Sequence, residues 1–221
     1  MSNVTLADIK ANKKIETMIR HSNECLEAIG YTDHGPRHVG YVSKIAGNIL
    51  EQLDFDARRV ELAKIAGWVH DVGNMINRKH HGMLSSVLLL PVLSEAGMDF
   101  EEVCDVCSAI GNHEEETGQT VSDISAALII ADKVDAHKAR VRLKQYNPED
   151  IHDRVNFSIK STSMNVDKKN RVIAIEYAMD STSSITEFLE IYLKRMRMCE
   201  RAAKYLDCTF ALSFNGVRIN M

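Results

Sequence analysis

The sequence predicts a mainly α-helical fold with a small α+β appendage at its C-terminal end. Two observations support this prediction. Apolar residues recur at helical spacing over the first two thirds of the 221 residues, whereas short alternating segments suited to strands follow Pro148. With 45% hydrophobic residues, a chain of this length can also bury one sizeable core. We therefore predict a helical domain over residues 1–148 and a tail over residues 149–221.

The helical domain is predicted to contain several amphipathic segments. Gly30 and Gly97 each end one of them, because glycine readily adopts the left-handed conformation that follows a helix. Ser122 and Asp123 are both good N-caps for the last segment. The third segment is apolar almost throughout and is expected to be buried. The segments cover residues 6–29, 37–53, 62–72, 81–96, 100–112 and 123–132.

The tail is predicted to form a hairpin, a long helix and a second hairpin. Apolar and polar residues alternate over 155–159 and again over 173–177, with a turn at 167–170 between them. A long amphipathic helix is expected over 185–206. Asn215-Gly216 is a strong signal for a two-residue turn between two further strands.

Composition excludes several classes of protein. The formal net charge of −4 argues against nucleic-acid binding through bulk electrostatics. No apolar run approaches the roughly 20 residues of a bilayer span, and the N-terminal residues lack a secretory pattern. The five cysteines are odd in number and scattered, which suits free thiols in a reducing compartment. We expect a cytoplasmic protein without a membrane partner.

Most of the nine histidines lie in the helical part, near helix ends or glycines. The most informative pair is His70-Asp71, at the end of the segment that carries Trp68. An imidazole and a carboxylate at the rim of an apolar core are costly unless something binds them. A divalent metal would compensate that cost, and these ligands suit Zn, Fe, Mn, Ni or Co better than calcium. A single buried histidine is more often a hydrogen-bonded core residue, so the prediction depends on the ordered set.

The order of these residues resembles the H…HD…H…H…D pattern of the HD-domain superfamily of metal-dependent phosphohydrolases. The local context is similar as well, because His34 precedes the first histidine, Gly73 follows the His-Asp pair, and Lys133 follows the last aspartate. The resemblance covers most of residues 30–140, and it implies an HD-type helical bundle with a metal site between helices. The matching residues are His38, His70, Asp71, His81, His113 and Asp132.

The resemblance also implies which residues bind metal. His38, His70, Asp71 and Asp132 would hold one ion. Family members with two additional histidines hold a second ion, which Asp71 would share with His81 and His113. His80 competes with His81, and the His81-Gly-x-x-Ser85 pattern favours His81. The expected cofactor is two divalent transition metals per chain (Fe, Mn, Zn, Co or Ni), with Mg as an alternative.

The chemistry of such a site is the hydrolysis of a phosphate ester. Two metals about 3.5–4 Å apart activate a water and neutralise charge on a phosphoryl group. The predicted substrate is a nucleotide or another small phosphorylated molecule, and the predicted catalytic residues are Asp71, His34 and Lys133. For His34, the alternative is an ordinary histidine at a helix start. Asn74 stands where some HD families have a lysine or arginine, which argues against cyclic dinucleotides.

Charged residues near these positions are expected to be mostly solvated. Arg78 and Lys79 are interpreted as surface cations, and the glutamates at 114–116 as a solvated turn in which one could orient His113. The basic face of the long tail helix is likewise expected to face water, with a homodimer interface or an effector pocket as alternatives. Two other functions remain open: an HD-fold di-iron oxygenase, and a non-catalytic ligand-binding module that a metal stabilises.

Overall fold

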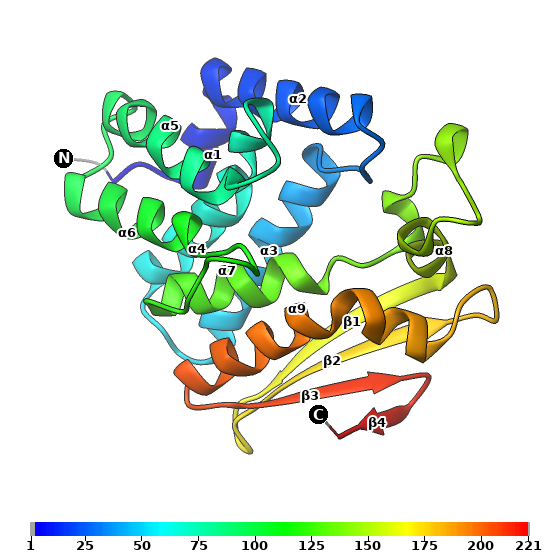
Figure 1. Ribbon diagram of the computed structural model, residues 1–221. Coiled ribbons are helices and arrows are strands. Elements are labelled where there is room, and N and C mark those ends of the chain that lie inside the picture. Colours follow the sequence, from blue (N-terminus) through cyan, green and yellow to red (C-terminus); the bar gives the residue numbers. More distant parts are fainter. Residues whose placement is uncertain (1–2, 221) are drawn as a thin grey trace.

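The computed structural model describes residues 3–220 and has a helical body followed by a layer of one long helix and a four-stranded sheet (Figure 1). The body contains α1 (Leu6–Ala11), α2 (Lys13–Ala28), α3 (Pro36–Gln52), α4 (Ala57–Val69), η1 (Val72–Met75), α5 (His81–Glu95), α6 (Phe100–Gly111), α7 (Asp123–Val134), η2 (Lys138–Arg140) and η3 (Leu143–Gln145). The remainder contains α8 (Ile151–Ser158), β1 (Ile159–Asp167), β2 (Val172–Met179), α9 (Ile185–Tyr205), β3 (Thr209–Phe214) and β4 (Val217–Ile219).

The mainly helical prediction is confirmed, with one difference at the start of the chain. The predicted helix over 6–29 is two helices, α1 and α2, because Asn12 leaves helical geometry between them. Its side chain accepts hydrogen bonds from the backbone N–H groups of Lys14 and Ile15 and so caps α2. The apolar periodicity continues across this break, and periodicity alone therefore did not reveal it.

The core of the body lies where α3, α4, α6 and α7 meet. Helix α7 is buried on every side from Ile124 to Ala131, as its continuous apolar run requires. Helices α3 and α4 pack so closely that a Cβ atom added to Gly67 would lie 2.7 Å from the Cα atom of Ser43. Glycine is therefore required at this contact, which fixes the position of the C-terminal end of α4.

The tail departs from the prediction at its first element. The segment 155–159, predicted as a strand, is mostly helix α8, and β1 begins only at Ile159. Asp150 caps α8 by accepting from the backbone N–H of His152, and Asn156 donates to the His152 carbonyl one turn earlier. Local side-chain hydrogen bonds thus stabilise a helix here, although the two-residue alternation of apolar residues predicts a strand. The predicted domain boundary at 148 falls in the connection between η3 and α8.

The two predicted hairpins join into one sheet of order β1-β2-β3-β4. Strands β1 and β2 are antiparallel, as are β3 and β4, whereas β2 and β3 are parallel with α9 connecting them. Helix α9 lies between α7 and the sheet (Figure 1). Phe188 of α9 packs on Tyr177 and Phe214 of the sheet, with both ring-centroid distances at 4.8 Å. The hydroxyl of Tyr177 donates to the carbonyl of Lys133 at 3.2 Å, so the sheet directly supports the end of α7.

Among residues 3–220, no helix combines the length and apolar character needed to cross a membrane.

Gly67→Ala should destabilise the fold by about 1–3 kcal/mol, because the new methyl group would overlap the α3 backbone. Gly40→Ala is the matched control. It lies inside α3, its added Cβ would meet only Trp68 at 3.5 Å, and removing a helix-interior glycine stabilises by roughly 0.5–1 kcal/mol. Urea denaturation followed by circular dichroism measures both. Equal free energies of unfolding for the two variants would contradict the close helix contact.

Candidate metal centre

Five helix ends in the body converge and place six histidine and aspartate side chains together. The ligating candidates come from the first turn of α3, the end of α4, the start of α5, the second residue after α6 and the last turn of α7. Gly73 permits part of this convergence, because a Cβ atom there would lie 2.2 Å from the carbonyl oxygen of His81. The converging residues are His38, His70, Asp71, His81, His113 and Asp132.

The first cluster pairs two imidazoles with two carboxylates. The Nε2 atom of His38 lies 3.6 Å from Asp71 Oδ2 and 3.4 Å from Asp132 Oδ1. The Nε2 atom of His70 lies 3.5 and 3.6 Å from the same two oxygens. Ligand atoms of His38, His70 and Asp71 lie within 4.8 Å of one another, and those of His70 and Asp132 do so together with His113, so both groups could hold a cation.

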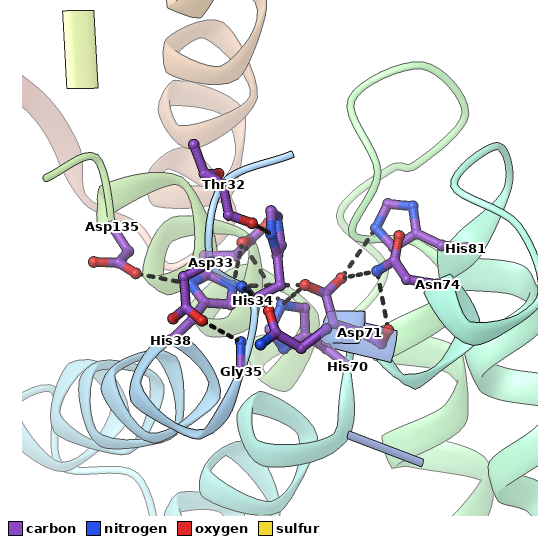
Figure 2. A network of polar contacts seen from close by, with 12 residues as sticks. Thr32, Asp33, His34, Gly35, His38, His70, Asp71, Asn74, His81 and Asp135 are labelled. Atoms are coloured by element: carbon purple, nitrogen blue, oxygen red, sulfur yellow. Dashed lines mark hydrogen bonds and ion pairs between the residues drawn. The ribbon is translucent and has the colours of Figure 1, made fainter. Parts of the chain in front are cut away.

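The second cluster uses the other oxygen of Asp71. His81 Nε2 lies 3.2 Å from Asp71 Oδ1, and His113 Nε2 lies 3.8 Å from it. The side-chain amide of Asn74 donates to the same oxygen at 3.0 Å and fixes the carboxylate plane (Figure 2). Asp71 thus faces one cluster with each oxygen, as a carboxylate shared between two ions would.

The histidine nitrogens test whether a metal fits. Among the described residues, the Nε2 atoms of His38 and His70 are buried without a hydrogen-bond partner. Their Nδ1–H groups donate to the Asp135 carboxylate at 2.8 Å and to the Gly67 carbonyl at 3.0 Å, which leaves both Nε2 lone pairs directed at the cluster. A buried acceptor without a donor is costly, and a cation at this point would satisfy both. The residues present therefore fit a divalent metal.

Charge is balanced unevenly across the two clusters. Burial alone would raise the pKa of Asp71, but His70 and His81 beside it hold that pKa well below its usual range. Burial opposes protonation of His81, yet Asp71 and Glu114 raise its pKa to about 9. Burial and the neighbouring His81 lower the pKa of His113 to about 3. Metal binding at His81 would compete with its protonation.

Two carboxylates orient the ligands. The role of Asp135 was not predicted, and Glu114 contacts His81 rather than His113, which a glutamate of this turn was expected to orient. Asp135 accepts a hydrogen bond from Nδ1 of His38 (Figure 2). The guanidinium of Arg37 in turn holds the Asp135 carboxylate through hydrogen bonds of 3.0 and 3.1 Å. Glu114 contacts Nδ1 of His81. The three-residue spacing from Asp132 to Asp135, just beyond a helix end, was the available signal for the first. No sequence signal linked Glu114 to a histidine 33 residues earlier.

The prediction of a solvated glutamate turn is wrong for two of its three residues. Glu114 is buried beside His81, and Glu115 binds Arg195 of α9 at 2.5 Å. Burial raises the pKa of Glu115, but Lys133 and Arg195 outweigh this and bring it to about 2. Only Glu116 is exposed. The prediction was wrong because the partners of these glutamates lie far away in the sequence: His81 contacts Glu114, and Lys133 and Arg195 contact Glu115.

The basic residues around the centre divide into bound and solvated groups. Lys133 is buried and contacts Asp132 Oδ2 at 2.5 Å, leaving Oδ1 to face the histidines. Arg78 is half-buried and donates to Asn74 at 3.2 Å, contrary to the expected surface position. Lys79 is exposed, as expected. On α9, Arg195 alone leaves the solvated face; the exposed residues are Lys194, Arg197, Arg201 and Lys204.

A pocket of about 950 Å³ opens onto the centre. His34, Asp71, His81, Asp132 and Lys133 line it, and α9 closes one side. Within this pocket His34 lies beside the metal-binding groups but belongs to none of them. Its Nδ1–H donates to the Thr32 carbonyl at 2.7 Å, and its Nε2 accepts from Arg140 at 2.8 Å. Burial and Arg140 keep the pKa of His34 well below its usual range, so the ring is neutral.

His80 differs sharply from its neighbour His81. It adopts a left-handed conformation, with φ of 62°, immediately before α5. It lies at the pocket wall and belongs to none of the groups that could hold a metal ion, whereas His81 belongs to one.

Asp135→Ala should weaken metal binding by about 10–100-fold, because His38 loses the acceptor that orients its ring. Asp135→Asn keeps an oxygen acceptor and should retain more of the affinity. Competition with a fluorescent chelator measures both, with Glu116→Gln as a control carboxylate in the same region. Unchanged affinity in a folded Asp135→Ala protein would show that Asp135 does not position the ligand.

No family model matches the chain. An uncharacterized protein of Methanocaldococcus jannaschii is 24% identical over 214 residues, which cover 84% of this chain and 80% of that protein. A crystal structure of a predicted HD superfamily hydrolase from an uncultured Thermotogales bacterium is 22% identical, with a TM-score of 0.45 over 57% of this chain and 69% of that chain. Within residues 3–220, the histidine and aspartate groups described above could hold a metal ion.

Proposed function

We propose that this chain is a metal-dependent hydrolase that cleaves a phosphate ester of a nucleotide or another small phosphorylated molecule. The observation that carries the proposal is the pair of buried, unpartnered Nε2 atoms of His38 and His70, which face oxygens of Asp71 and Asp132. Such a constellation has no role in packing, because it leaves acceptors unsatisfied inside a core.

The proposed ligand sets follow from the two oxygens of Asp71. His38, His70, Asp71 and Asp132 would hold one ion, and Asp71, His81 and His113 the other. Imidazole and carboxylate ligands suit Fe, Mn, Zn, Co or Ni. When bound, such ions supply Lewis acidity and lower the pKa of a coordinated water.

The chain's own residues bind and orient the substrate in this proposal. Lys133 presents a buried cation next to Asp132, where it would contact a phosphoryl oxygen. Burial lowers the pKa of Lys133, but Asp132 and Glu115 outweigh it and raise the pKa, so this side chain keeps its charge. The neutral ring of His34 accepts from Arg140 and would hold that guanidinium at the pocket wall. The pocket is large enough for a nucleotide-sized molecule.

Metal content tests the two-ion arrangement. Protein purified without chelators or a histidine tag should carry about two transition-metal ions per chain by plasma mass spectrometry. One ion per chain would remove His81 and His113 from the ligand set. No ion after reconstitution with Mn, Fe, Co, Ni and Zn would overturn the metal centre itself.

Asp71→Ala should abolish hydrolysis, by roughly 1,000-fold or more, and leave the protein poor in metal, because both ions lose a ligand. The assay is phosphate release from a panel of nucleoside mono- and triphosphates, sugar phosphates and phosphodiesters, with each metal in turn. Glu51→Gln, at an exposed carboxylate of α3 that does not line the pocket, is the control and should retain activity. Normal turnover by folded Asp71→Ala protein would refute the assignment, and oxygen consumption without phosphate release would favour an oxygenase.

A further inference from the structure

Arg195 reaches the pocket from α9, a helix that lies outside the segment carrying every metal-ligand candidate. Two contacts fix its position. Its Nε atom lies 2.5 Å from Oε1 of Glu115, and its Cζ atom lies 4.8 Å from the centre of the Tyr192 ring. Tyr192 is itself buried, and its hydroxyl donates to Oδ1 of Asn156 at 3.2 Å. The guanidinium is therefore held in place in advance, as a preorganised binding group requires.

The terminal nitrogens of this guanidinium remain available. Among residues 3–220, neither Nη atom of Arg195 donates a hydrogen bond to the protein, and the ion pair with Glu115 is made through Nε. The side chain is 30% exposed and lines the pocket that opens onto the metal centre. Arginine N–H groups form a fork that matches two oxygens of one phosphate. Arg195 can thus bind an anion without releasing Glu115.

A continuous path of contacts joins Arg195 to the metal-ligand candidates. Oδ1 of Asp132 faces two imidazoles, and Oδ2 contacts Nζ of Lys133 at 2.5 Å. The same Nζ lies 3.5 Å from Oε1 of Glu115, which is the oxygen that Arg195 also approaches. All four side chains line the same pocket. Two cations therefore share one carboxylate oxygen on the wall beside the proposed metals.

The charges of these four side chains do not balance once a metal is bound. Glu115 supplies one negative charge to both Lys133 and Arg195, and the other partner of Lys133 is Asp132. Asp132 belongs to a group that could hold a metal ion, and a bound ion would neutralise that carboxylate. One of the two cations then has no carboxylate of its own. An anionic group of the substrate would supply the missing charge.

We propose that Arg195 binds a second phosphate group of the substrate, adjacent to the phosphate that Lys133 contacts at the metal centre. The substrate would then carry a diphosphate or a longer phosphate chain instead of a single phosphate. Adjacent phosphates follow because both cations approach one oxygen atom, which keeps them within reach of one short chain. This assignment rests on the proposed function and specifies its substrate class.

Binding of two simple ligands tests the role of Arg195. Isothermal titration calorimetry on the metal-loaded full chain compares inorganic phosphate with methylenediphosphonate, which has two phosphorus groups and a bridge that resists hydrolysis. Metal ion is kept in excess of ligand so that chelation does not empty the sites. Arg195→Gln should weaken binding of the diphosphonate by at least about tenfold and leave binding of phosphate unchanged. Arg195→Lys should recover only part of this loss, because lysine lacks the fork.

Arg197→Gln is the matched control for this measurement. Arg197 lies on the same helix, pairs with Glu200 at the surface and does not line the pocket, so its loss should leave both affinities unchanged. The proposal would be overturned if wild-type protein bound the diphosphonate no more tightly than phosphate, or if Arg195→Gln bound it as tightly as wild type. An equal loss for both ligands would also overturn it, because Arg195 would then act on the metal centre or the fold.

Hydrolysis is measured separately, so that failure of this assignment and failure of the proposed function are distinguishable. In the active enzyme, Arg195→Gln should raise KM for substrates with two or more linked phosphates and leave turnover of monophosphates unchanged. Hydrolysis of monophosphates alone, at full rate in Arg195→Gln, would support the proposed function and overturn the role of Arg195. Arg195-dependent binding of the diphosphonate, without phosphate release from any substrate of the panel, would do the reverse.

Discussion

Everything at the centre depends on the burial of Asp71 among imidazoles. A carboxylate removed from water at the rim of an apolar core is unfavourable unless opposite charge or hydrogen-bond donors surround it. Here Oδ2 of Asp71 faces His38 and His70, and Oδ1 faces His81 and His113. The amide of Asn74 fixes the plane of the carboxylate. Helix ends from separate segments meet around this carboxylate, and their side chains supply the surrounding donors.

The supporting interactions surround this centre in a defined order. Each histidine uses Nδ1 to contact a fixed acceptor, either a carbonyl of its own helix or a carboxylate from another segment, and turns Nε2 inward. The Asp135 carboxylate is in turn held by Arg37. Ring orientation is therefore set by the packing of the helices before any ion arrives, which lowers the entropy lost on binding.

The sequence was informative about local order and uninformative about distant pairing. The metal-binding candidates were predictable because a His-Asp pair at the end of an apolar helix is conspicuous, and because the remaining residues follow in a recognisable order. Glu115 was misread because its partners, Lys133 and Arg195, lie on two other helices. The strand predicted at 155–159 failed for a local reason, since Ile151, Val155 and Ser158 also share one helix face and the capping by Asp150 decides between the two patterns. The division of the chain at residue 148 stays a prediction.

The contact between Arg195 and Glu115 has a consequence for the order in which the protein is made. A ribosome delivers the helical body first, and every candidate metal ligand has been synthesised before α9 exists. At that stage the wall of the pocket is missing, the Lys133 carbonyl lacks the Tyr177 hydroxyl, and Glu115 has only one of its two cations. A nascent chain therefore contains all the candidate ligands before it contains the helix that closes one side of the pocket. The C-terminal third thus separates, along the chain and in time, the residues proposed to bind metal from the wall that completes the pocket.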